Sequence, residues 1–157
     1  MTNIGVRLAV LSLITGLAVV TAAQAQEKKI KREELPPAVE KTVVEQSKGS
    51  TIKGFSTEVD KGKRLYEVEL TVNGHSKDIS MEKDGKIVEV EEEVAMDSLS
   101  PEVKAGLKRA AGSGTITKVE SLTKGGKLVA YEADVKYGTK HSEVQVGPNG
   151  KKLAHEE

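Results

Sequence analysis

Two stretches with alternating apolar and polar side chains constrain the fold of this chain more than any other feature. In residues 66–72 every second residue is apolar, and the residues between them are glutamate or threonine. Residues 131–137 repeat this alternation 65 positions later. Alternate side chains of a strand point to opposite faces of its sheet, so each stretch predicts a strand with one buried face and one wet face.

The first 25 residues have the pattern of a secretory signal peptide. Arg7 precedes an apolar run over residues 8–20, and Ala23 and Ala25 occupy the positions that a signal peptidase reads. We expect cleavage after Ala25 and a periplasmic or secreted chain with no membrane attachment. The alternative is a retained membrane anchor, but the apolar run is shorter than the roughly 20 residues that a spanning helix needs.

The composition excludes several classes of function. The chain has no cysteine, which rules out disulfides, thiolate catalysis and zinc–thiolate sites. Its 24 basic and 24 acidic residues leave no basic excess, so we expect no nucleic-acid partner. It has no tryptophan, one phenylalanine and three tyrosines, which argues against a deep aromatic pocket.

The order of patterns predicts an α+β fold built from two tandem units. A flexible segment (26–34) is followed by a first unit (35–96), with a helix over 37–47 and strands over 51–59, 64–72, 75–82 and 87–93. A second unit (97–157) repeats the order, and Ser100 and Pro101 begin its helix. We expect each unit to pack one helix on a three- or four-stranded antiparallel sheet. The units would then pack together or share an extended sheet.

The residues of the first unit resemble a known family, the PepSY-like domain. The resemblance rests on a Leu-x-Pro-x-Val start to the helix, a Thr-Ile strand, Tyr-Glu-Val-Glu-Leu, an Asn-Gly hairpin and an Asp-Gly-Lys turn, at residues 35–39, 51–52, 66–70, 73–74 and 84–86. The second unit matches less closely, since Ala133 replaces a larger apolar residue and Gly138 stands in place of Asn73. The family is similar to a secreted β-lactamase inhibitor protein of two such units. The resemblance implies a module that binds or inhibits proteins such as peptidases, with no catalytic residues to transfer.

No pattern in the sequence predicts a catalytic, cofactor or metal site. The three histidines, His75, His141 and His155, are interpreted as surface residues, because the strand phase puts His141 and His155 on opposite faces. Three hypotheses remain: a non-catalytic module that binds another protein, an enzyme that uses acidic residues with a metal, and a sensor of a small ligand or divalent metal.

Acidic residues gather on the predicted wet faces of the strands. They give a solvated face that discourages aggregation, a docking surface for a protein with basic groups that is contacted mainly through the first unit, or a weak site for a divalent cation. The candidate partner-binding residues are Glu67, Glu69, Asp78, Glu89, Glu91, Glu132 and Asp134.

Overall fold

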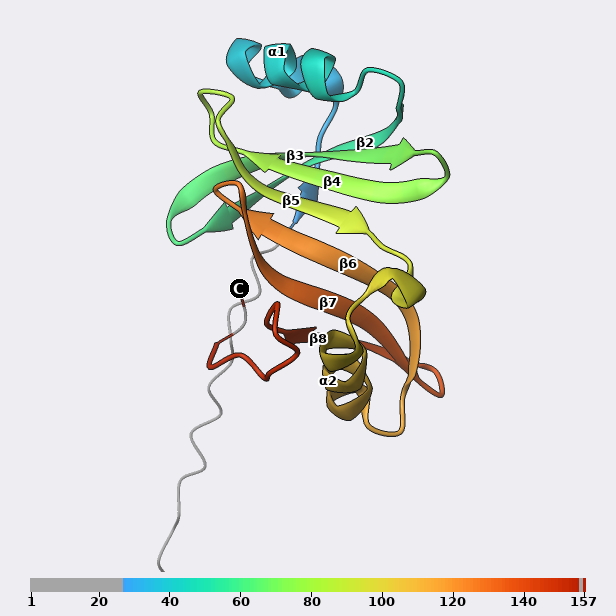
Figure 1. Cartoon of the computed structure of the whole chain (residues 1–157). Coiled ribbons are helices and arrows are strands. Elements are labelled where there is room, and N and C mark those ends of the chain that lie inside the picture. Colours follow the sequence, from blue (N-terminus) through green and yellow to red (C-terminus); the bar gives the residue numbers. More distant parts are fainter. Residues whose placement is uncertain (1–26, 156) are drawn as a thin grey trace, which may run out of the picture.

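The computed structural model describes residues 27–155 and 157, which form one eight-stranded antiparallel sheet with two α-helices on one of its faces (Figure 1). The predicted signal peptide, residues 1–25, lies outside the described residues. The strands lie in the sheet in the order in which they occur along the chain. Each strand therefore pairs with the next one, and the connections are short.

The elements follow one another as β1 (Lys28–Lys29), η1 (Arg32–Glu34), α1 (Pro37–Gln46), β2 (Thr51–Asp60), β3 (Lys63–Val72), β4 (His75–Met81), β5 (Ile87–Glu93), η2 (Met96–Ser98), α2 (Pro101–Ala111), β6 (Thr115–Lys124), β7 (Lys127–Tyr137) and β8 (Lys140–Val146), where η marks a short 3₁₀ helix. The predicted start of α2 is confirmed: the Ser100 hydroxyl accepts a hydrogen bond from the Val103 amide at 3.2 Å. The Asn73-Gly74 hairpin is also present, and both residues have positive φ.

Each helix packs its apolar residues on a different half of the sheet. Val39 and Val43 of α1 are fully buried against β3 and β4, where they meet Val68, Leu70, Ile79 and Met81. Val103 and Leu107 of α2 are buried against β6, β7 and β8, where they meet Val119, Ala133, Val135 and Val146. The predicted buried face of the strand over residues 66–72 is thus confirmed.

The prediction of two units with a small sheet each is wrong. The sheet continues from β5 into β6 over five residue pairs, from Glu89 opposite Lys124 to Glu93 opposite Glu120. Periodicity identifies single strands but does not reveal whether the last strand of one half pairs with the first strand of the next. Pairing satisfies two strand edges that separate sheets would leave open. The predicted boundary between residues 96 and 97 stays a prediction.

Two local predictions need correction as well. The segment expected to be flexible forms β1, which pairs with Ser56 and Thr57 of β2, and η1, where Arg32 contacts Glu40 at 2.7 Å. The pairing of β4 with β5 shifts register between Ser80 and Met81, and the extra residue lies in β5. Ile87, rather than the predicted Val88, therefore pairs with Met81 and packs on the core. A bulge of this kind reverses the faces of the residues beyond it, which alternation alone does not reveal.

The turn before β5 is held tightly against α1. The Thr42 hydroxyl donates a hydrogen bond to the Gly85 carbonyl at 2.9 Å, and a Cβ added at Gly85 would lie 2.5 Å from the Ala38 carbonyl oxygen. Gly85 also has a φ of 81°. This position therefore requires glycine both for its backbone conformation and for the close approach of the helix.

Gly85→Ala should destabilise the protein more than Gly74→Ala. Both glycines have positive φ, but Gly74 has nothing within 4 Å of an added Cβ. Gly74→Ala should therefore cost about 1 kcal/mol from backbone strain alone, and Gly85→Ala about 1–3 kcal/mol more because α1 must shift. Urea unfolding of both variants measures the difference, and equal losses of stability would contradict the close contact between the turn and α1.

Candidate functional site

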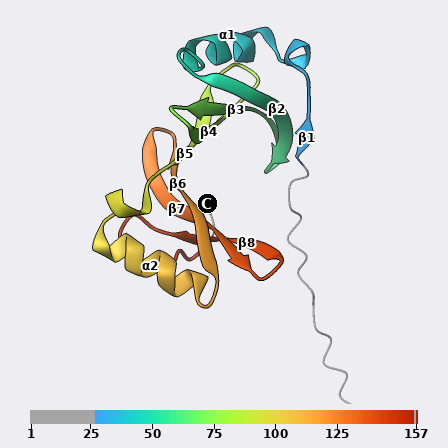
Figure 2. The same cartoon turned by 90° about the vertical axis from the view of Figure 1, so that its right-hand side faces the viewer.

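The sheet is curved, and the face opposite the helices is concave (Figure 2). It forms an open hollow of about 800 Å³. The residues that line the hollow come from the N-terminal segment, five strands and the C-terminal segment: Glu27, Glu58, Glu67, Glu89, Glu91, Glu132, Asp134, His141, Ser142, Glu143, Gln145 and Glu157. Nine of these twelve residues are acidic, and in the described part of the chain neither lysine nor arginine is among them. We call this surface the acidic concave face.

The strand register brings the predicted partner-binding residues together on this face. Glu69 lies opposite Asp78, and Asp78 lies opposite Glu91, so three carboxylates cross three neighbouring strands in one row. Five of the seven predicted residues line the hollow, and Glu69 and Asp78 lie beside it on the same face. All seven are half-buried rather than fully exposed. Their role in binding a partner stays a prediction.

Sequence reasoning missed four acidic residues of this face: Glu27, Glu58, Glu120 and Glu157. Glu27 belongs to the segment that was expected to be flexible. Glu58 lies on β2, where a register shift between Ile52 and Gly54 breaks the alternation. Glu120 could have been found, because the Val-Glu-Ser-Leu sequence at 119–122 alternates as the other strands do.

Glu120 is the most deeply buried of these carboxylates, with 5% of its surface exposed. It accepts a hydrogen bond from the Ser76 hydroxyl at 3.0 Å and pairs with the Lys118 ammonium at 2.8 Å. The same ammonium lies 3.5 Å from Asp134. One lysine therefore compensates two carboxylates here, and a second lysine, Lys124, pairs with Glu89 at 3.1 Å.

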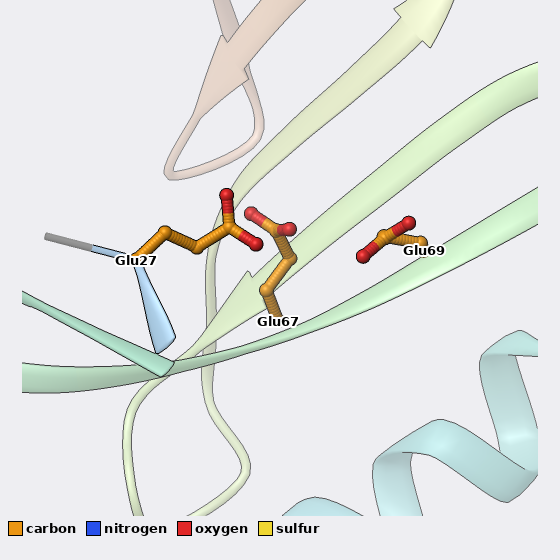
Figure 3. A group of neighbouring side chains, drawn as sticks. All are labelled: Glu27, Glu67 and Glu69. Carbon is orange, nitrogen blue, oxygen red and sulfur yellow. The ribbon is translucent and has the colours of Figure 1, made fainter. Parts of the chain in front are cut away.

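Two groups of three carboxylates bring one oxygen of each residue within 4.8 Å of the others. One group is Glu27, Glu67 and Glu69, which Figure 3 shows with the carboxylates of Glu27 and Glu67 side by side and that of Glu69 beyond them. The other group is Asp78, Glu91 and Glu120. Carboxylate oxygens are the ligands that hard cations such as Ca²⁺ prefer. Glu120 already has a lysine and a serine as partners, so the second group is partly compensated from within the chain.

Crowding and burial favour the protonated form of several of these groups. Burial, helped by the charges of Asp78 and Glu27, raises the pKa of Glu67 to about 7. Burial, followed by the charges of Glu132 and Glu89, raises the pKa of Glu91 to about 8. The acidic concave face therefore carries less negative charge near neutral pH than its number of carboxylates indicates.

Two of the histidines lie close to acidic groups. His75, the first residue of β4, has its Nδ1 3.2 Å from a carboxylate oxygen of Glu93, the last residue of β5. His141, on β8, is exposed and lines the hollow. His155 is exposed and follows the last strand. The interpretation of the three histidines as surface residues agrees with their exposure.

No helix within the described residues is long and apolar enough to cross a membrane.

Comparison with known proteins identifies the fold. No protein-family model matches the sequence, and no curated protein does. Among the solved structures that match are three from Bacteroides at 15–18% identity. A BLIP-like protein from Bacteroides fragilis matches with a TM-score of 0.54 and 18% identity, and the alignment covers 76% of this chain and 83% of that one. The chain has a BLIP-like fold.

The other two structures agree with this fold. A DUF2874 family protein from Bacteroides ovatus has a TM-score of 0.57 and 18% identity, over 76% of this chain and 84% of that chain. A protein from Bacteroides eggerthii that is described as a putative periplasmic protein has a TM-score of 0.60 and 15% identity, over 76% of this chain and 86% of that chain. The PepSY-like relationship of this BLIP-like chain stays a prediction.

The protein should become less stable as the pH rises from about 5 to about 8. The folded-state pKa values of Glu67 and Glu91 are raised above their ordinary value of 4.5, so the folded chain binds protons that the unfolded chain has released. Their contribution to stability is complete below about pH 4.5 and is lost as the pH rises through about 7 to 8. Thermal unfolding at pH 5 and pH 8 measures this slope for the whole protein.

Glu91→Gln isolates the contribution of one group. The neutral amide should raise Tm at pH 8 by a few degrees, which corresponds to about 1 kcal/mol or more, and should change Tm little at pH 5. Glu45→Gln is the matched control because Glu45 is exposed on α1. If Glu91→Gln changed Tm by the same amount at pH 5 and pH 8, the assignment of the proton to Glu91 would be wrong.

Proposed function

We propose that this chain is an exported, non-catalytic protein that binds another protein on its acidic concave face. The observation that carries the proposal is the hollow of about 800 Å³ in which nine carboxylates converge on a curved sheet. The hollow is open to solvent and polar, and it differs from the enclosed, mostly apolar pockets that take small molecules. A rounded protein surface with lysine or arginine side chains complements both its curvature and its charge.

Three further points support export and binding. The pattern of residues 1–25 predicts a signal peptide, and one protein of the same fold is described as a putative periplasmic protein. The resemblance to the PepSY-like domain implies binding or inhibition of proteins such as peptidases. The periplasmic location and the binding role are applied to this chain as part of the proposal.

Neutralising the acidic concave face should weaken binding of the partner. The variant E67Q/E89Q/E132Q removes one carboxylate from each of β3, β5 and β7 without a large change in side-chain volume. We expect affinity to fall about tenfold or more, mainly through slower association, and its salt dependence to weaken. The partner is first captured from periplasmic extract of the producing cell and identified, and its binding is then titrated at two salt concentrations.

The matched control is E33Q/E45Q/E102Q, which removes the same number of carboxylates at exposed positions on η1, α1 and α2. It should bind as the parent does. Circular dichroism verifies that both variants are folded. Equal affinity of the two variants would show that the concave face is a solvated surface, and the helical side would then be the place to search.

The same variants test the alternative of a divalent-metal sensor. Binding to the folded state raises Tm by mass action. A Ca²⁺-dependent rise in Tm of the parent that E67Q/E89Q/E132Q lacks, with no captured protein, would favour the sensor over the docking protein.

A further inference from the structure

The last strand of the sheet, β8, has an open edge. On one side it pairs with β7 along its whole length, and on the other side the described residues form a single bridge, between Val146 and Lys152. The four consecutive residues 140–143 are all exposed. An unpaired edge of this kind is a template on which another strand can add.

The opposite edge of the sheet is interrupted, because β1 pairs with Ser56 and Thr57 in the middle of β2 and the Ile30 amide donates to the Phe55 carbonyl. There the outermost strand is β1, which consists of two exposed lysines, Lys28 and Lys29. Very short, lysine-bearing edge strands are a common means of preventing edge pairing. The two edges of this sheet therefore differ, and strand addition is favoured at β8.

The geometry of the β7–β8 hairpin shows which residues of β8 have free backbone groups. A two-residue turn follows Tyr137, which pairs with Lys140. The two residues that close such a turn exchange backbone hydrogen bonds. Along the rest of the two strands, hydrogen-bonded pairs then alternate with pairs that are not hydrogen-bonded. Even-numbered residues of β8 therefore bond to β7, and odd-numbered residues present N–H and C=O outward. The Gly147 amide fits this parity, because it donates outward to the Lys151 carbonyl at 2.8 Å.

The C-terminal segment occupies one end of this edge. It forms the Val146–Lys152 bridge, and the Glu157 amide donates to the Gln145 side chain at 2.9 Å. His141 and Glu143 remain as the outward-facing residues of β8 that no described backbone group pairs with. Both side chains lie on the acidic concave face, because alternate residues share a face.

We propose that the edge of β8 binds a second copy of this chain. The two β8 strands pair antiparallel about a two-fold axis through Ser142, so that His141 of each copy lies opposite Glu143 of the other. Both pairs use the outward-facing backbone groups and exchange their hydrogen bonds. They also place an imidazole opposite a carboxylate on each side of the axis, which is a favourable cross-strand combination.

The alternative registers are less favourable. A shift by one residue would turn the side chains of one copy to the wrong face of the joint sheet. A shift by two residues keeps the side chains on the correct faces but places the axis at Glu143, so that two carboxylates face each other. This register also requires Gln145, which the C-terminal segment already contacts. Self-complementarity in one register is the reason to assign a second copy rather than an unrelated strand.

The structure also leaves room beside β8 for an arriving strand. A hollow of about 410 Å³ lies between α2 and this edge, and Arg109, Ala110 and Val144 are among the residues that line it. In the proposed register, Lys140 of the second copy lies opposite Val144, so its alkyl chain enters this hollow. The paired segment is short compared with standard protein interfaces, and we therefore expect a weak dimer that forms at high protein concentration.

A charge-exchange experiment tests the pairing. Sedimentation equilibrium of the exported chain, residues 26–157, should show a monomer–dimer equilibrium. H141E and E143K should each shift it to monomer, because H141E places two carboxylates opposite each other and E143K removes the carboxylate that faces the imidazole. The double variant H141E/E143K restores opposite charges across the axis and should recover the dimer. H155E is the control, since His155 is exposed and lies outside β8.

Cross-linking tests the register independently. The chain contains no cysteine, and Ser142 would lie on the axis in a non-hydrogen-bonded pair with Cα atoms about 4.5 Å apart, within disulfide range. S142C should therefore form disulfide-linked dimers faster than S113C, an exposed control at the end of α2, and faster than E143C. A parent that is monomeric at every concentration, together with S142C cross-linking no faster than S113C, would overturn the proposal. A dimer unaffected by H141E and E143K would overturn it as well.

Discussion

The hydrogen bonding between β5 and β6 is the interaction on which the rest of this structure depends. It joins the strands under α1 to the strands under α2 and leaves the sheet with only two edges. Because all eight strands belong to one continuous sheet, the polar residues of both halves lie on a single face. The twist between neighbouring strands accumulates across the joined strands, and the common face is concave. Separate sheets would give two unrelated polar surfaces and no shared hollow.

This junction places two carboxylates directly opposite each other, and its stability depends on their partners. Glu93 lies opposite Glu120, and like charges in this position are destabilising. The Ser76 amide donates to Glu93 at 3.0 Å, and this bond and His75 lower the pKa of Glu93. Glu120 has Lys118 and the Ser76 hydroxyl. Because β4 supplies a residue that contacts both carboxylates, the junction is tolerated where an isolated glutamate pair would open it.

The sequence predicted the strands and their faces but not their assembly. Alternation in residues 66–72 was sufficient to place Val68 inside and Glu67 and Glu69 on the opposite face, because period two is a local property. Pairing of β5 with β6 joins residues 120 and 93, and nothing in either segment specifies its neighbour. Bulges prevented the assignment of Glu58 to this face and exchanged the faces expected for Ile87 and Val88, because one extra residue changes the face of every later residue. The predicted acidic residues were found together, whereas their half-burial follows from curvature, which a residue pattern does not encode.

The acidic concave face and the open edge are connected by two residues, since His141 and Glu143 line the hollow and also lie on the edge of β8. Pairing of two copies would set the two concave faces next to each other in one longer sheet and would place an imidazole beside each Glu143. A partner that covers His141 would compete with this pairing, whereas one that spans both faces would strengthen it. Thermodynamic linkage makes either effect reciprocal. The concentration of this chain and that of its partner would then jointly set how much of the acidic concave face is occupied.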